Sequence, residues 1–222
     1  CRSGRRILDG RCTVMCSMRF KTMSAVFARS LSVGLLGPVS AFAQRSVATW
    51  LGVSGFDIRL CVAFFHGKLV VAEAGHGGNN CIPASASNPL ICFGRSSQIS
   101  RVNTVTGIHT PLVDHLFSVA EFHAPGQPPD TLGASGLSAR GGTLMAIVGV
   151  YPQALANYQC AEGDSACEAD LAAGRQQAGA LLSVKANGSW RKVAGVGAFD
   201  FDFTANIPNQ EHDANPNGVL AA

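Results

Sequence analysis

Residues 58–74, IRLCVAFFHGKLVVAEA, contain two runs of strand-forming residues that are joined by a short turn. The runs 58–65 and 68–74 are rich in valine, leucine, isoleucine and phenylalanine, as β-strands usually are. A His-Gly pair joins them, and glycine tolerates the positive φ that a two-residue hairpin turn requires. This stretch therefore predicts an antiparallel β-hairpin.

The same hairpin pattern returns along the chain in a fixed order. Each unit has a strand, a tight turn, a strand, a long polar insertion, and then a second pair of strands. The further strands are predicted at 97–103, 109–114, 135–141, 143–150, 180–186 and 189–195, and the insertions at 75–96 and 151–179. The segment 215–222, NPNGVLAA, matches the start of a third unit.

Tandem repetition of a four-stranded antiparallel meander is typical of a β-propeller. A β-sandwich also contains many short strands, but it does not predict an insertion at the same place in each repeat. We therefore predict an all-β protein and a β-propeller, of which this chain forms about two blades and the start of a third. Within the second insertion, ACEADLAAGRQQAG at 166–179 predicts a short surface helix that ends at a glycine.

Each insertion also carries one pair of cysteines. Cys81 and Cys92 flank a segment rich in proline and serine, and Cys160 and Cys167 flank AEGDSA. Because each pair closes a short loop, Cys81–Cys92 and Cys160–Cys167 are the expected disulfides. A zinc site is the alternative, but CxxC spacing is missing and the histidines are scattered. Cys61 lies in an apolar run and is expected to be buried as a small hydrophobic residue.

The first 43 residues differ in kind from the rest. Residues 18–43 have a basic start, a short apolar core and the small-x-small end Ala-Phe-Ala, as a secretory signal peptide does. A short amphipathic helix is the alternative interpretation. We expect residues 1–17 to lie upstream of the natural start, and the propeller domain to comprise 44–222. Because the chain stops within an apolar run, we also expect a C-terminally truncated fragment.

The charge of the whole chain is misleading because the signal peptide is basic. The full sequence has 17 Lys+Arg and 14 Asp+Glu, for a formal net charge of +3. Residues 1–43 hold seven of the basic residues and one acidic residue, so the remainder has ten basic and thirteen acidic residues, a net charge of −3. This composition gives no basic face and argues against a nucleic-acid partner. No stretch after the signal is long and apolar enough to span a membrane as a helix.

Several motifs resemble one known family. They are LVVAEAGHGGNNCIP (69–83), ICFGRSSQISRV (91–102), GALLSV (179–184), GSWRKVAGVGAFD (188–200) and HDANPNGVLA (212–221). Their order is similar to that in the bacterial ScyD/ScyE-type family of exported proteins, named from the scytonemin-biosynthesis cluster. The resemblance covers most of the chain from about residue 50 onward. It implies a six-bladed β-propeller that is related in architecture to NHL and gluconolactonase-like proteins.

The resemblance also implies a function. Members of the family are exported, and some are linked to secondary metabolism, so we expect a secreted or periplasmic protein. Our first hypothesis is that it binds a small molecule or an extracellular polymer. The alternative is a metal-dependent, gluconolactonase-like hydrolase; a third possibility is a structural or adhesive propeller. The sequence has no G-x-S-x-G elbow with a matching His and Asp, so no catalytic residue is assigned and enzymatic activity stays an open question.

Two places are candidates for a ligand site. Glu73 ends a strand and precedes a glycine-rich loop, where a carboxylate can coordinate Ca²⁺. No cofactor is assigned from the sequence, and Ca²⁺ is the one candidate. The alternative is that Glu73 fixes the loop by hydrogen bonds to nearby backbone. Asn215 and Asn217 supply amide oxygens of the type that calcium accepts, and His212 and Asp213 belong to the same predicted binding loop. An Asx-turn that leads into a strand is the structural alternative for that loop.

Overall fold

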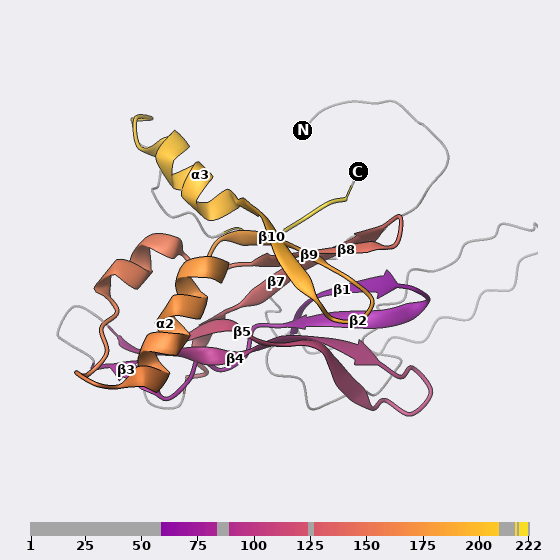
Figure 1. The fold of residues 1–222 in the computed structure, drawn as a ribbon, viewed down its shortest axis with the longest axis horizontal. Helices are drawn as coiled ribbons and strands as arrows, with labels where there is room; N and C mark the ends of the chain where they lie inside the picture. The colour runs from indigo at the N-terminus through magenta and orange to yellow at the C-terminus, as the bar shows by residue number, and fades with distance from the viewer. Residues whose placement is uncertain (1–58, 84–88, 124–126, 209–215, 217, 222) are drawn as a thin grey trace, which may run out of the picture.

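The computed structural model describes residues 59–83, 89–123, 127–208, 216 and 218–221. They form two antiparallel sheets with few helices, which confirms the predicted all-β class (Figure 1). The expected upstream segment 1–17 and signal peptide 18–43 lie outside the described residues. No helix in the described part of the chain is both long and apolar enough to cross a membrane.

The first sheet contains the hairpin from which the sequence argument started. Its strands are β1 (Arg59–Phe65), β2 (Lys68–Glu73), β3 (Asn80–Ile82), β4 (Leu90–Val102), β5 (His109–Phe122) and β6 (Asp130–Leu132). The order across the sheet is β1-β2-β4-β5-β6, and β3 pairs with β4. His66 and Gly67 in the β1–β2 turn have φ of 48° and 70°, as a tight two-residue hairpin turn requires.

The second sheet repeats the meander without additions. Its strands are β7 (Ala134–Arg140), β8 (Thr143–Val148), β9 (Ala180–Val184) and β10 (Trp190–Gly195), in the order β10-β9-β8-β7. The predicted strand, turn, strand, insertion, strand, turn, strand sequence is therefore present in both sheets. The three hairpins that the sequence predicts from their turns, β1–β2, β7–β8 and β9–β10, are all present as antiparallel pairs.

The first insertion is more ordered than a polar loop. The prediction placed 75–96 outside the strands, yet β4 begins at Leu90, and β3 is part of the same sheet. The first half of β4 pairs with the second half of β5, from Leu90 opposite Phe122 to Gly94 opposite Ser118. The prediction of a loop is wrong here because β5, the strand that pairs with this part of β4, continues to Phe122, well beyond its predicted end at residue 114.

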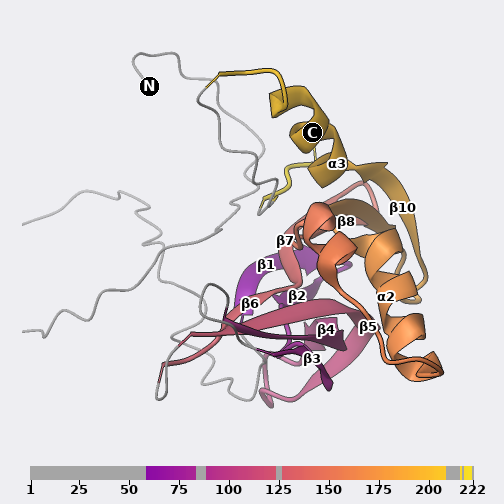
Figure 2. The ribbon, with the colours of Figure 1, turned by 90° about the vertical axis from the view of Figure 1, so that its left-hand side faces the viewer.

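The second insertion forms the 3-10 helix η1 (Pro152–Asn157) and the helix α2 (Ser165–Gln177). The Asp164 side chain caps α2 by accepting a hydrogen bond from the Cys167 amide at 3.0 Å. The predicted helix is present, but it is more than a surface helix, since it packs on β4 and β5 (Figures 1 and 2). A Cβ added at the buried Gly174 would lie 2.9 Å from the Phe117 ring, so glycine permits this close packing.

The two sheets share one hydrophobic core. Side chains from both sheets and from α2 form a continuous buried cluster that includes Phe93, Phe117, Leu137, Leu171 and Leu182. β1 of the first sheet lies next to β7 of the second, and the Cys61 thiol donates to the Leu137 carbonyl oxygen at 3.8 Å. Cys61 is 2% exposed, as expected for a buried cysteine.

Central strands of both sheets are apolar on both faces. In β2, Val70 and Ala72 belong to the shared core, whereas Leu69 and Val71 belong to a second buried cluster. In β8, Ile147 is 2% exposed although its neighbours Ala146 and Val148 point to the shared core. A sheet that is covered on one side only would alternate apolar and polar residues instead.

The last described segment extends this arrangement. After β10 the chain forms helix α3 (Val196–Thr204), and residues 216 and 221 lie against β7, the edge strand of the second sheet. The Ala221 amide donates to Ser138 Oγ at 2.9 Å, and Ser135 Oγ donates to the Pro216 carbonyl oxygen at 3.3 Å. Thus β7 has β1 on one side and the residues of the predicted third unit as a further neighbour.

One buried tyrosine makes the stability of this fold sensitive to alkaline pH. Tyr158 stacks on Phe93 with ring centroids 5.0 Å apart. Burial, aided by the Glu121 carboxylate, raises the pKa of Tyr158 from 10.0 to about 12. The unfolded chain therefore loses this proton first, so the stabilising contribution is complete below pH 10 and is lost as pH rises toward 12.

We expect the free energy of unfolding to fall by about 2 kcal/mol over this pH window because of Tyr158 alone. Urea unfolding of the wild type and of Tyr158→Phe, each below pH 10 and near pH 12, measures this contribution. The phenylalanine variant keeps the stacked ring but has no ionisable group. An identical pH dependence in both proteins would contradict the prediction.

Candidate functional site

The backbone of the glycine-rich loop after β2 packs closely against the backbone of β4. Gly77 has a φ of +75°, and a Cβ at this position would lie 2.4 Å from the Cys92 carbonyl oxygen. A Cβ at Gly78 would lie 2.3 Å from the Phe93 carbonyl oxygen. The loop therefore lies directly on β4, and glycine is required because the two backbones approach so closely.

Two serine hydroxyls fix this loop. Ser96 Oγ accepts from the His76 amide at 2.9 Å and donates to the Gly77 carbonyl oxygen at 2.6 Å. Ser118 Oγ accepts from the Gly77 amide at 3.0 Å and donates to the Ala74 carbonyl oxygen at 2.6 Å. The loop is therefore positioned rigidly on β4 and β5, which is what a pre-organised binding loop needs.

Glu73, the predicted calcium ligand, lies at the start of the loop but inside the protein. Its carboxylate belongs to a residue that is 1% exposed, and Oε1 accepts hydrogen bonds from Ser100 Oγ and from Gln98 Nε2, the latter at 2.9 Å. Both of these donors are side chains of β4. The Glu73 carbonyl oxygen accepts from Ser97 Oγ at 2.8 Å.

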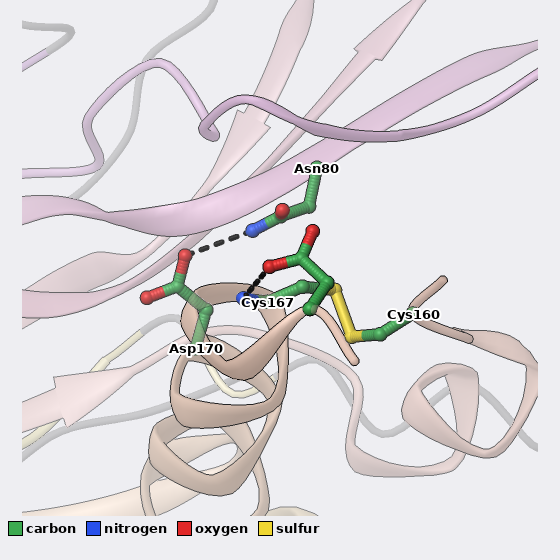
Figure 3. The surroundings of a disulfide bond; sticks show 5 residues. Asn80, Cys160, Cys167 and Asp170 are labelled. Carbon is green, nitrogen blue, oxygen red and sulfur yellow. Dashed lines mark hydrogen bonds between the residues drawn. A yellow bond between two sulfur atoms is a disulfide. The ribbon is translucent and has the colours of Figure 1, made fainter. Parts of the chain in front are cut away.

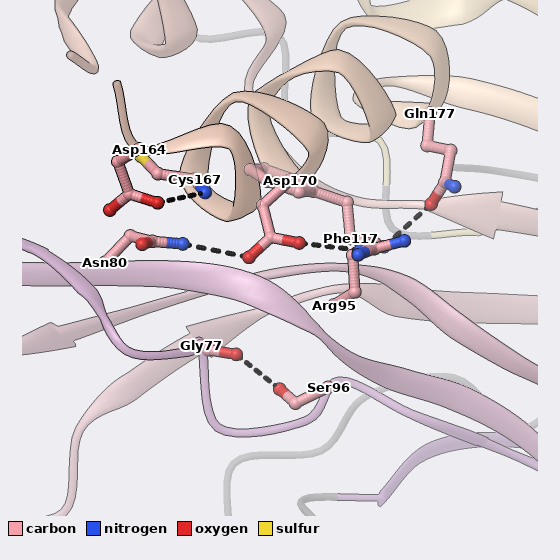
Figure 4. Close-up of polar contacts among 9 residues, drawn as sticks. All are labelled: Gly77, Asn80, Arg95, Ser96, Phe117, Asp164, Cys167, Asp170 and Gln177. Carbon is pink, nitrogen blue, oxygen red and sulfur yellow. Dashed lines mark hydrogen bonds and ion pairs between the residues drawn. The ribbon is translucent and has the colours of Figure 1, made fainter. Parts of the chain in front are cut away.

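A polar cluster of side chains lies beside the loop, where β3, β4 and α2 meet. Asp170 of α2 accepts from Asn80 Nδ2 at 2.8 Å through one carboxylate oxygen. Its other oxygen accepts from Arg95 Nε at 2.6 Å, in an ion pair with Arg95 of β4 (Figure 4). The Arg95 side chain is 41% exposed, so this pair contributes little stability and its outer face remains accessible to solvent.

The cluster forms one wall of a surface hollow of about 300 Å³, here called the polar hollow. Its lining consists of residues 76–79 of the loop, Asn80 of β3, residues 94–96 of β4, and Ala166 and Asp170 of α2. Most of the lining is polar or glycine backbone. The guanidinium, carboxylate and amide groups provide both donors and acceptors, an arrangement that suits a ligand with several hydroxyl groups.

Both expected disulfides are present, and Figure 3 shows Cys160–Cys167 together with Asn80 and Asp170 of this cluster. Cys81–Cys92 joins directly paired residues of β3 and β4, immediately after Asn80. Cys160–Cys167 connects the segment after η1 to the first turn of α2, one turn before Asp170. The two cross-links therefore hold both segments from which Asn80 and Asp170 come.

The remaining predicted site residues cannot be placed. His212, Asp213, Asn215 and Asn217 lie outside the described residues. The sequence did not suggest Arg95 or Asp170, which are 75 residues apart. Within the described ranges, no three His, Cys, Asp or Glu side chains gather closely enough to hold a metal ion.

Comparison with known proteins adds no relative: no family model, no curated protein and no solved structure matches this chain.

Proposed function

We propose that this chain is part of an exported six-bladed β-propeller of the ScyD/ScyE type, and that it binds a small molecule or a polymer outside the cytoplasm. The polar hollow carries the functional part of the proposal. Its wall combines the half-exposed Arg95 of β4, the Asp170 carboxylate of α2 and the Asn80 amide of β3. One disulfide links β3 to β4, and the other ties the start of α2 to the segment before it. We therefore propose a neutral, hydroxyl-rich ligand such as a sugar or a polysaccharide.

The apolar faces of the central strands support the propeller. In a propeller every blade is packed between two others, so its central strands need apolar residues on both faces. β2 and β8 have this pattern. Pro216 and Ala221 form hydrogen bonds with β7, and the inner strand of a third blade would begin at this position.

The disulfides support export. Cross-links between cysteines persist in oxidising compartments such as the periplasm and the extracellular space. Four of the cysteines in the described ranges are in disulfides, and Cys61 is buried. A secreted or periplasmic location is therefore part of the proposal.

Binding of neutral sugars tests the function directly. Saturation-transfer NMR of the full chain with a panel of neutral oligosaccharides should detect at least one ligand. Arg95→Gln should then weaken binding by about tenfold, because it removes a charged donor from the wall of the hollow. Asn79→Ala, at an exposed residue of the same lining, should weaken it by a smaller factor.

The matched control is Arg175→Gln, which removes an exposed arginine of α2 outside the hollow. It should leave the affinity unchanged, and thermal unfolding should show that all three variants are folded. If no oligosaccharide binds, or if both arginine variants weaken binding equally, the hollow is not the binding site for a neutral sugar.

A further inference from the structure

Charge is separated between the two ends of the sheets. We call the end that carries the four tight turns the turn end and the opposite end the insertion end. The segments at the turn end, 66–68, 101–110, 139–143 and 185–192, contain no acidic residue and six basic ones: Lys68, Arg101, Arg140, Lys185, Arg191 and Lys192. The insertion end contains seven of the ten acidic residues in the described part of the chain, namely Glu73, Glu121, Asp130, Glu162, Asp164, Glu168 and Asp170.

The four turns also lie close together in space. Arg101 Nη2 donates to the Ala186 carbonyl oxygen at 2.5 Å, which joins β4 to the β9–β10 turn. A Cβ added at Gly142 in the β7–β8 turn would lie 3.8 Å from His66 Cε1 in the β1–β2 turn. Positive charges from both sheets therefore act on the same region of the surface.

This end contains a second hollow, here called the turn-end hollow, with a volume of about 620 Å³. The β1–β2 and β4–β5 turns lie side by side (Figure 1). The hollow is lined by residues of both turns and by the paired residues Leu69 and Val102. Its volume is within the range of small-molecule sites. Leu69 and Val102 are buried beneath it, whereas Val105 is 93% exposed and Ile108 is 64% exposed.

Two cations line the turn-end hollow together with these apolar side chains. Lys68 and Arg101 belong to the lining, and no Asp or Glu does. Neither cation forms an ion pair with a carboxylate among the described residues. The loop that carries Val105 is fixed, because Asn103 Oδ1 accepts from the Val105 and Thr106 amides at 2.9 and 3.2 Å.

We propose that the turn-end hollow binds a small organic anion with an apolar body, such as an aromatic carboxylate or sulfonate. The acid group lies between Lys68 and Arg101, where charge-assisted hydrogen bonds are stronger than neutral ones. The apolar body covers Val105 and Ile108, which are otherwise exposed to water. This site is separate from the polar hollow, because the two have no lining residue in common.

Naphthalene-2-sulfonate is a suitable probe because it combines an aromatic body with one permanent negative charge. Titration of the full chain, followed by calorimetry or by saturation-transfer NMR, should show saturable binding. Lys68→Gln should weaken binding by about tenfold, and Val105→Asp should abolish it. The neutral analogue naphthalene-2-sulfonamide should bind about tenfold more weakly than the sulfonate.

Lys192→Gln is the matched control, since Lys192 is an exposed lysine of β10 that does not line the hollow. The charge of Lys192 acts on the hollow only from a distance, so Lys192→Gln should weaken binding by less than about twofold. Arg175→Gln in α2, at the insertion end, should leave the affinity unchanged. Equal affinity for the sulfonate and the sulfonamide would overturn the proposal, as would equal losses in the two lysine variants. Absence of saturable binding would overturn it as well.

Discussion

Replacing Gly77 by alanine is expected to lower the free energy of unfolding by about 3 kcal/mol or more. Two costs add at this position. Gly77 has a φ of +75°, which a residue with a Cβ adopts only with strain. The new Cβ would also lie 2.4 Å from the Cys92 carbonyl oxygen and 3.0 Å from the Ala120 Cβ, so backbone would have to move.

Gly141→Ala is the matched control for this prediction. Gly141 in the β7–β8 turn has a φ of +58°, but a Cβ there would meet no atom within 4 Å. This variant has only the conformational cost, which is about 1 kcal/mol. Urea unfolding of both variants therefore separates strain from close packing. Equal losses of stability would show that the loop after β2 does not lie as tightly on β4 as the structure has it.

Replacing Glu73 by alanine should be similarly damaging, with a loss of about 3 kcal/mol in the free energy of unfolding. The substitution removes the oxygen that accepts from Ser100 and Gln98. Ser100 is fully buried, so its hydroxyl would lose this partner in a place that water does not reach. Glutamine has a side chain of the same length with a carbonyl oxygen at its end, so Glu73→Gln should lower the free energy of unfolding by only about 1 kcal/mol.

The same pair of variants tests the calcium hypothesis for Glu73. Because the carboxylate is buried and accepts two hydrogen bonds, we expect Ca²⁺ at about 10 mM, above the Kd of extracellular calcium sites, to leave the Tm of the wild type unchanged. A rise in Tm in the wild type that is missing in Glu73→Gln would instead support a metal site.

Local signals in the sequence were sufficient for the hairpins. The His-Gly, Gly-Gly and Asn-Gly turns mark the ends of strands. His66 and the four glycines at these turns have the positive φ that their composition implies, whereas Asn187 does not. The repeated order of the strands and the spacing of the cysteines are also visible without a structure. These features depend on residues that are close together in the sequence.

The missed features depend on residues that are far apart in the sequence. The first half of β4 has a mixed composition and becomes a strand because β5 continues beside it to Phe122. The buried side of α2 includes Gly174, a small residue that gives no apolar signal although it packs on Phe117. Asn80, Arg95 and Asp170 meet only after α2 has packed on the first sheet.

The distribution of charge over the surface is another feature that depends on residues far apart in the sequence. The net charge of −3 for residues 44–222 suggested that no basic face exists, yet the tight turns place their lysines and arginines at one end of the sheets. Antiparallel strands separate their successive connections to opposite ends. A sum over the sequence cannot detect this separation, whereas the topology determines it.

The buried position of Cys61 makes its thiol a probe of motion between the two sheets. The Cys61 thiol lies between β1 and β7 and donates a hydrogen bond to the Leu137 carbonyl oxygen. It belongs to neither disulfide. An alkylating reagent can reach the sulfur only when the two sheets move apart. The rate at which Cys61 is labelled in the folded protein therefore measures how often the two sheets open along β1 and β7.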